Sequence, residues 1–187
     1  MTVAKDEDDV RVRLQRAALA LFLEHGYERT TAAGIAARTG MTERTFFRYF
    51  PDKREVLFGG EAVLQSALTN SIADAPVGLG PLAILFRAFR SVVVLLEDNR
   101  RFSVPRQKVI DASPALQERE LAKHAAMADS IAAALAARGV ADLPAALAAR
   151  TGMAVFVHVT MSWLADPKPT LGERLDLAAS ELKALML

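Results

Sequence analysis

The sequence contains no cysteine. Its 187 residues therefore hold no disulfide, no thiolate nucleophile and no cysteine metal ligand, a composition that fits a reducing compartment. The N-terminal stretch MTVAKDEDDV is acidic and lacks the apolar core of a signal peptide. The longest apolar run, Met153 to Ala165, is shorter than the ~20 residues that span a bilayer. We therefore expect a cytoplasmic protein without a membrane partner.

Motifs of enzymes and metal sites are also missing from the sequence. We find no nucleophile motif, no glycine-rich phosphate loop and no carboxylate pair. The histidines, His25, His124 and His158, are too far apart for a metal motif such as two histidines four residues apart. The sequence thus predicts neither an enzyme nor a bound cofactor or metal.

The net charge of +1 conceals an uneven distribution. Between Arg11 and Arg54 there are nine basic and four acidic residues, whereas the chain from Gly59 onward carries thirteen of each. A local excess of positive charge indicates a polyanionic partner. Charge alone leaves open the alternative of an ordinary solvated helical surface.

Three short helices are predicted within the first fifty residues. The first spans about Asp9 to His25, where apolar residues recur at spacings of three and four and Gly26 provides a stop. The second runs from Thr31, its N-cap, to near Gly40, and the third from Thr42, its N-cap, to near Pro51. Two short helices joined at a glycine are typical of a helix-turn-helix.

The rest of the chain is also predicted to be helical, so the expected fold is all-α. One long helix from Asp52 to about Ile72 would connect the third helix to a linker, Ala73–Pro81, which contains two prolines and two glycines. The β-branched run AVFVHVT could form a strand, but it has no partner strand, so we interpret it as a helix buried on all sides. The further predicted elements are a helix at 82–97, a broken piece at 99–110 around Pro105, a helix opened by Ser113 and closed by Gly139, a helix at 142–165, and a final helix at 171–187 with a Thr170–Glu173 capping box.

The stretch GMTERTFFRYF carries four aromatic residues in a chain with only 6% of them. At 100° per residue, Phe46, Phe47 and Phe50 fall on one arc of the third helix, which we expect the first two helices to cover. The opposite arc carries Arg44, which can fork onto a guanine edge, and three side chains able to reach phosphates or a thymine methyl, namely Thr45, Arg48 and Tyr49. The sorted arcs predict a surface for reading DNA.

The segment TTAAGIAARTGMTERTFFRYFPDKREVL, within the region from Arg11 to Leu57, resembles the DNA-binding region of TetR/AcrR-family transcriptional regulators. The resemblance implies a homodimeric all-helical regulator of double-stranded operator DNA, released by a small-molecule effector and most often a repressor. It divides the chain into a helix-turn-helix DNA-binding domain at 1–58 and a helical effector-binding and dimerisation domain at 59–187.

The resemblance also assigns roles to single residues. It implies base contacts from Glu43 and Arg44, and phosphate contacts from Thr31, Thr45, Tyr49 and Lys53. Two departures from the family pattern stand out. Phe47 occupies the place of a phosphate-binding tyrosine, and small residues at 32–34 replace larger ones, with Gly34 costing the second helix about 1 kcal/mol relative to alanine.

The C-terminal part offers candidates for the effector pocket and the dimer interface. Side chains that can line an apolar pocket are Phe86, Phe89, Phe102, His124, Met127 and Phe156. The same spacing also suits an ordinary core. The resemblance implies a dimer through the last two helices, and an apolar stripe on the final helix provides the candidate contacts Leu175, Ala178, Leu182 and Leu185.

Two alternatives remain at this point. A basic cluster could receive an anionic effector, form a solvated face or contact the DNA-binding domain, and it consists of Arg87, Arg90, Arg100, Arg101, Arg106 and Lys108. The chain as a whole could be a helical binding module whose helix-turn-helix does not engage DNA.

Overall fold

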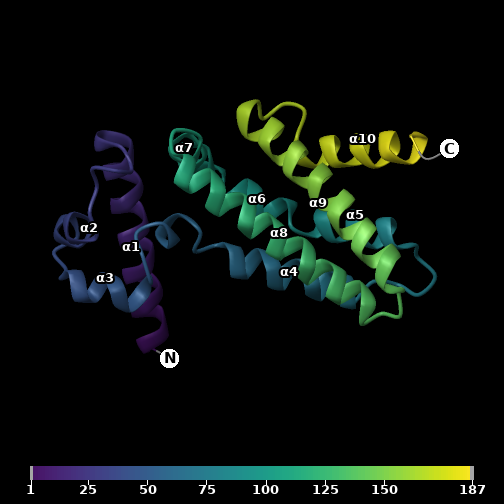
Figure 1. Cartoon of the computed structure of the whole chain (residues 1–187), viewed down its shortest axis with the longest axis horizontal. Coiled ribbons are helices and arrows are strands. Elements are labelled where there is room, and N and C mark those ends of the chain that lie inside the picture. The colour runs from purple at the N-terminus through teal and green to yellow at the C-terminus, as the bar shows by residue number, and fades with distance from the viewer. Residues whose placement is uncertain (1, 186–187) are drawn as a thin grey trace. The chain divides into compact units, whose positions relative to one another are not determined.

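A computed structural model describes the backbone of residues 2–185 and the side chains of residues 9–185. Within these residues every regular element is a helix, which confirms the predicted all-α fold (Figure 1). The chain forms two compact units. The first comprises the residues up to Gly60 together with Pro105–Glu118, and the second comprises Glu61–Val104 together with the residues from Arg119 onward.

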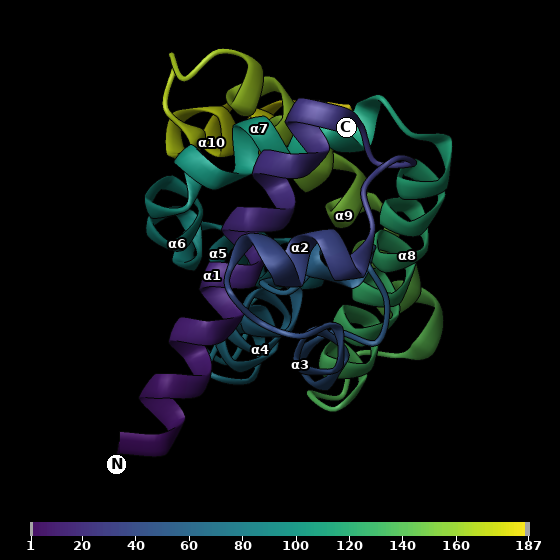
Figure 2. The same ribbon diagram turned by 90° about the vertical axis from the view of Figure 1, so that its left-hand side faces the viewer.

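The first unit is built on α1 (Thr2–His25), α2 (Ala32–Arg38) and α3 (Glu43–Tyr49), close to the three predicted helices. The first helix begins earlier than the expected Asp9. Gly26 and Gly40 adopt φ angles of 82° and 72°, the left-handed region in which glycine is favoured. Each glycine therefore ends a helix as predicted, and α2 lies across α1 (Figure 2).

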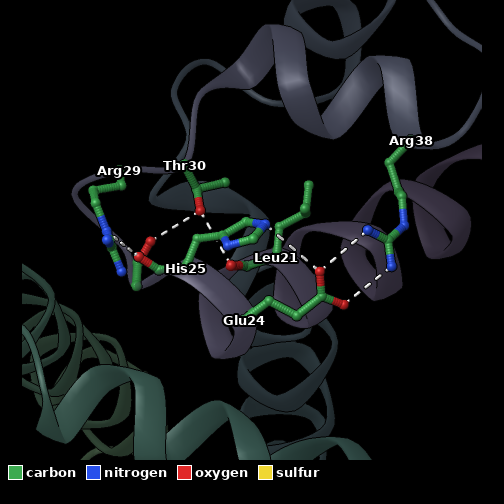
Figure 3. Close-up of polar contacts among 7 residues, drawn as sticks. Leu21, Glu24, His25, Arg29, Thr30 and Arg38 are labelled. Atoms are coloured by element: carbon green, nitrogen blue, oxygen red, sulfur yellow. Dashed lines mark hydrogen bonds and ion pairs between the residues drawn. The ribbon is translucent and has the colours of Figure 1, made fainter.

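Polar contacts fix the turn between α1 and α2 (Figure 3). Thr30 Oγ1 donates to the carbonyl oxygens of Leu21 at 3.2 Å and Gly26 at 2.9 Å. Arg38 reaches back from α2 and binds both carboxylate oxygens of Glu24 at 3.0 and 3.2 Å. These bonds hold the turn after α1 and the end of α2 against the last turns of α1.

The predicted continuous helix from Asp52 to Ile72 is wrong. The chain instead forms a turn, a single 3-10 turn η1 (Glu55–Leu57), a break at Gly59–Gly60 and then α4 (Glu61–Ala73). The Asp52 carboxylate starts this turn, because it accepts bonds from the backbone N–H groups of Arg54 and Glu55 as an N-cap does, and the chain then breaks at Gly59–Gly60 before α4 begins. No continuous rod connects α3 to the linker.

The remaining helices are α5 (Pro81–Ser91), α6 (Val93–Asp98), α7 (Arg100–Asp111), α8 (Pro114–Ala136), α9 (Asp142–Ala165) and α10 (Leu171–Ala184). The expected helix at 82–97 is split at Val92 into α5 and α6, and the expected broken piece around Pro105 is one continuous helix. Proline at that position removes one backbone hydrogen bond without ending the helix.

Of two N-caps predicted for the later helices, one is present and the other is not. The Thr170–Glu173 capping box is confirmed, with the Thr170 backbone N–H donating to the Glu173 carboxylate at 2.8 Å. Helix α8 begins at Pro114 as expected, but the Ser113 hydroxyl is buried without a hydrogen-bond partner among the described residues, so it forms no N-cap bond. Residues 186–187 of the predicted final helix lie outside the described part of the chain.

Helix α9 is the central element of the second unit. It packs against α5, where Gly152 brings its backbone so close that an added Cβ would lie 2.8 Å from Leu85 Cδ1. The Phe89 and Phe156 rings stack across this contact with centroids 4.5 Å apart. The run AVFVHVT is therefore helical as predicted, but it is not buried on all sides, because Ala154 and His158 are exposed.

Length and composition alone would also allow α9 to cross a membrane. The whole helix is longer than the apolar run Met153–Ala165 that the sequence suggested. Its buried face, which includes Met153, Phe156 and Trp163, belongs to the hydrophobic core of the second unit. We therefore assign α9 to that core.

Candidate nucleic-acid interface

Two threonines set the geometry of the helix-turn-helix. Thr31 Oγ1 accepts a hydrogen bond from the Gly34 backbone N–H at 3.0 Å, and Thr42 Oγ1 accepts one from the Thr45 N–H at 3.2 Å. Both threonines have extended backbone angles and stand as N-caps, as predicted. The starts of α2 and α3 are thereby fixed on either side of Gly40.

Buried aromatic rings hold α3 in place. Phe46 and Phe50 are 0% and 1% exposed, and their ring centroids lie 5.5 Å apart. Phe47 departs from the prediction that all three phenylalanines are covered, because 49% of it is exposed. At 100° per residue it lies at the edge of the apolar arc, next to Glu43, and α1 and α2 do not extend over that edge.

The polar arc of α3 faces solvent. Arg48 places its guanidinium 4.9 Å over the Tyr49 ring and donates to the tyrosine oxygen at 3.0 Å, which joins the two side chains. The Thr45 hydroxyl lies 3.0 Å from that of Thr42. Of the residues predicted to contact DNA on this helix, three are exposed and two are half-buried, namely Glu43, Arg44 and Arg48, and Thr45 and Tyr49. All five are thus α3 side chains that lie outside the buried core.

Two arginines of α1 position α3 by donating to backbone carbonyls at its end and in the turn before it, a role that the sequence analysis missed. Arg11 donates to the Tyr49 carbonyl at 3.2 Å and lies 5.0 Å over the Phe50 ring, while Arg13 donates to the Thr39 carbonyl at 3.0 Å. These partners are 38 and 26 residues away along the chain, so no local pattern indicates them. The two bonds fasten the end of α3 and the turn before it to α1.

Asp52 organises the turn that follows α3. Its carboxylate accepts bonds from the Arg54 guanidinium at 2.9 Å and from two backbone N–H groups. Burial alone would raise the pKa of Asp52, but the bonds from Arg54 and from the Glu55 backbone outweigh burial and lower the pKa below its ordinary value. The carboxylate is therefore kept ionised at neutral pH, opposite Arg54.

Lys53 lies in this turn rather than at the start of a helix. Its ammonium donates to the carbonyl oxygens of Tyr27 at 2.9 Å, Thr30 at 3.1 Å and Glu28 at 3.4 Å, and it lies 4.1 Å over the Tyr27 ring. An ammonium has three donors, so these carbonyls occupy all of them. Any contact of Lys53 with phosphate would compete with these acceptors.

Tyr27, below this ammonium, is buried against Phe22, with ring centroids 5.4 Å apart. Burial raises the pKa of Tyr27 to about 12, an effect only partly opposed by nearby Arg54. The tyrosine is therefore neutral at physiological pH. Together, Tyr27 and Lys53 connect the turn after α1 to the turn after α3.

The six predicted effector contacts divide into two groups. Phe89, Met127 and Phe156 are buried in the core of the second unit, and Phe86 packs edge-on against Phe89 with centroids 5.9 Å apart. Phe102 on α7 and His124 on α8 are half-buried. Four of the six thus serve as core residues, and contact with an effector stays a prediction.

An open groove of about 500 Å³ lies elsewhere in the second unit, between the starts of α5 and α9. Its lining consists of Gly80, Pro81, Leu82, Ala83, Pro144, Leu147, Ala148 and Thr151. None of the six predicted effector contacts belongs to this lining. Among the residues that the structure describes, no group of three histidines or carboxylates is placed to hold a metal ion.

The predicted dimer contacts on α10 differ in their exposure. Leu175 is fully buried against its own chain, so it is not available to a partner, and its assignment to the interface is wrong. The helix turns this position toward the core that it shares with α5 and α9. Ala178 and Leu182 are half-buried, and Leu185 is 83% exposed.

A capped pair of short helices, anchored by aromatic rings and presenting a polar and basic face, defines a helix-turn-helix DNA-binding protein. Residues 14–58 match the family model of bacterial regulatory proteins of the tetR family, and residues 79–186 match that of the MftR C-terminal domain. The chain belongs to the tetR family of transcriptional regulators, which are DNA-binding proteins and not enzymes.

Individual relatives agree with this assignment. The chain is 32% identical over 155 residues to TcmR, an HTH-type transcriptional regulator of Streptomyces glaucescens, and the match covers 80% of this chain and 69% of TcmR. Thermus thermophilus FadR, a TetR-family repressor solved with lauroyl-CoA, is 28% identical with a TM-score of 0.56, and 95% of each chain is covered. SmeT, the repressor of a Stenotrophomonas maltophilia efflux pump, shares the fold at 24% identity and a TM-score of 0.61, with 94% of this chain and 89% of SmeT covered.

The contacts of Lys53 predict a structural role that can be measured. Lys53→Met keeps the aliphatic stem but leaves three carbonyls without their donor, so we expect urea unfolding to show a stability loss of about 1–3 kcal/mol. Arg44→Met is the matched control, because Arg44 is exposed and its replacement should change stability by less than about 0.5 kcal/mol. Equal stability of the two variants would contradict the assigned role of Lys53.

Proposed function

We propose that the protein is a ligand-released repressor that binds a quasi-palindromic operator as a homodimer. The observation that carries the proposal is the solvent-facing polar arc of α3, backed by the buried rings of Phe46 and Phe50. A seven-residue helix has marginal stability on its own. Because packing nevertheless fixes α3, its exposed face is suited to dock against a partner. Two such helices in a dimer would enter successive major grooves about 34–36 Å apart.

Within this proposal, the side chains divide into two tasks. Glu43 and Arg44, in the first turn of α3, would read base edges. Phosphates would be held by the surrounding donors Thr31, Thr45, Arg48 and Tyr49. Lys53 would support the interface by fixing the turns and by adding positive charge, since its donors are already engaged.

Replacement of Arg44 tests base reading. Arg44→Ala should weaken binding to the true operator by about 1–3 kcal/mol and relax the preference at one base pair per half-site. Arg48→Ala is the matched comparison, because loss of a phosphate contact should weaken specific and random DNA alike and flatten the salt dependence by about one unit. Binding is measured by fluorescence anisotropy on both DNAs. If Arg44→Ala loses equal affinity on both, Arg44 does not read a base.

The dimer would form through α9 and α10. Outward-facing residues on α9 recur at spacings of three and four and carry no permanent charge, namely Leu147, Thr151, Ala154 and His158. Two leucines of the neighbouring α10, Leu177 and Leu185, are 62% and 83% exposed. A long uncharged stripe of this kind is normally covered by a partner. A second copy would cover it in a two-fold arrangement, with Ala178 and Leu182 at its edge.

A charge in the middle of this stripe should separate the protomers. Ala154→Glu would bury an unpaired carboxylate in the interface without changing the chain's own core, because Ala154 is exposed. Ala133→Glu on α8 is the matched control, since Ala133 is an exposed helical alanine outside the stripe. Light scattering should show a monomer for the first variant and a dimer for the second. A dimeric Ala154→Glu protein would place the interface elsewhere.

The proposed effector is a small molecule with a large apolar part. FadR, which is 28% identical, was solved with lauroyl-CoA, and the second unit of this chain offers an aromatic core. An effector releases DNA only if it binds better to a state in which the recognition helices no longer match the operator. Such coupling typically changes affinity by about 5–150-fold.

Reciprocal titrations test this coupling, with lauroyl-CoA as the first probe and free coenzyme A as its control. The factor by which lauroyl-CoA weakens operator binding must equal the factor by which operator weakens lauroyl-CoA binding. Anisotropy measures operator binding with and without lauroyl-CoA, and calorimetry measures lauroyl-CoA binding with and without operator. If a bound effector has the same affinity with and without operator, the protein is not a switch for that effector.

The alternative, a helical binding module whose helix-turn-helix does not engage DNA, makes the opposite prediction. Selection from random duplexes in the presence of competitor DNA would then enrich no sequence. The polar arc of α3 favours the operator-binding proposal.

A further inference from the structure

One exposed side chain of α3 has no polar group. Phe47 is 49% exposed although the neighbouring Phe46 and Phe50 are almost fully buried. Its ring meets the Phe46 ring edge-on, with centroids 5.5 Å apart and an interplanar angle of 89°. One side of the Phe47 ring is therefore held by packing within the chain, while the other side faces solvent.

Helical geometry places this ring among the proposed base-reading residues. Phe47 follows Glu43 by four positions and Arg44 by three, so all three side chains share one face of the helix. At 100° per residue, Phe47 projects between Glu43 and Arg44, and Thr45 and Tyr49 project from the other side. A recognition helix that brings Glu43 and Arg44 to the bases therefore brings the Phe47 ring there as well.

An apolar ring has few partners in a major groove. It has no donor for a phosphate oxygen and cannot hydrogen-bond a base edge, whereas the C5-methyl group of thymine is the apolar group that the groove presents. The deoxyribose also offers carbon atoms, near the backbone that the family's tyrosine at this position contacts. Because Phe47 projects between Glu43 and Arg44, the two proposed base-reading residues, the geometry favours a base contact over a sugar contact.

We infer that Phe47 is a specificity-determining residue that selects thymine by packing its ring against the C5-methyl group. This inference rests on the operator binding proposed above. It predicts that each operator half-site contains a thymine whose methyl group contributes to affinity through Phe47.

Deoxyuridine substitution isolates that methyl group, because it removes one carbon and leaves base pairing unchanged. The operator is first selected from random duplexes with the full-length protein, and each thymine is then replaced in turn by deoxyuridine. At one thymine position, replacement by deoxyuridine should weaken binding of the wild-type protein roughly fourfold per half-site. This is the effect of losing one buried methyl group. The Phe47→Ala variant should bind the thymine and deoxyuridine operators equally.

Further variants separate recognition from folding. Phe47→Leu keeps an apolar side chain and should retain part of the discrimination, and Leu23→Ala is the control because Leu23 is also exposed, at 50%, but lies on α1. Leu23→Ala should discriminate as wild type does. The wild-type measurement itself needs no variant, so a poorly folded Phe47→Ala protein does not prevent the test.

Four results would overturn the inference. If no deoxyuridine position weakens wild-type binding, or if Phe47→Ala still discriminates at that position, the ring does not read thymine, although operator binding stands. If Phe47→Ala weakens thymine and deoxyuridine operators by the same factor while wild type shows no difference, the ring contacts sugar or supports the helix. If selection enriches no DNA at all, the operator-binding proposal fails, and this inference fails with it.

Discussion

The burial of two rings, Phe46 and Phe50, is the constraint on which the DNA-binding surface depends. A helix of seven residues has too few hydrogen bonds to be stable alone, so its position comes from the packing of these rings and from the bonds that Arg11 and Arg13 make to its end and to the preceding turn. Thr42 fixes where the helix starts. The face of α3 that carries the exposed side chains is therefore oriented before any partner is present.

In the second unit, the close approach of the α9 backbone to α5 fixes how the helices pack. Gly152 allows α9 to lie against Leu85 and Phe89 of α5, and the stacked pair Phe89–Phe156 fills the space beside it. Interiors packed in this way change between discrete arrangements more readily than they deform by small amounts. An effector that inserted among these residues would have to move a helix, which is the kind of response that a switch requires.

Local signals in the sequence predicted local structure well. Thr31, Thr42 and the Thr170–Glu173 pair cap helices where expected, because a cap involves residues only three positions apart. Periodicity failed where tertiary contacts or turn chemistry decide. The helix expected from Asp52 is broken before α4, Leu175 faces its own core, and Phe47 lies just beyond the cover of α1 and α2. The candidate site was thus predictable as a surface, but the bonds that position it, such as those of Arg11 and Lys53, join residues more than twenty positions apart.

The carbonyl partners of Arg11, Arg13 and Lys53 have a consequence for how the protein meets a polyanion. A carbonyl oxygen orients a cation without cancelling its charge, so these three groups keep their full charge while their side chains have already given up much of their rotational freedom. Long basic side chains that are ordered only on binding lose about 0.5–1.5 kcal/mol each at that moment. Here part of that ordering accompanies folding, which leaves a field of fixed shape around α3 and lowers the entropic cost of association.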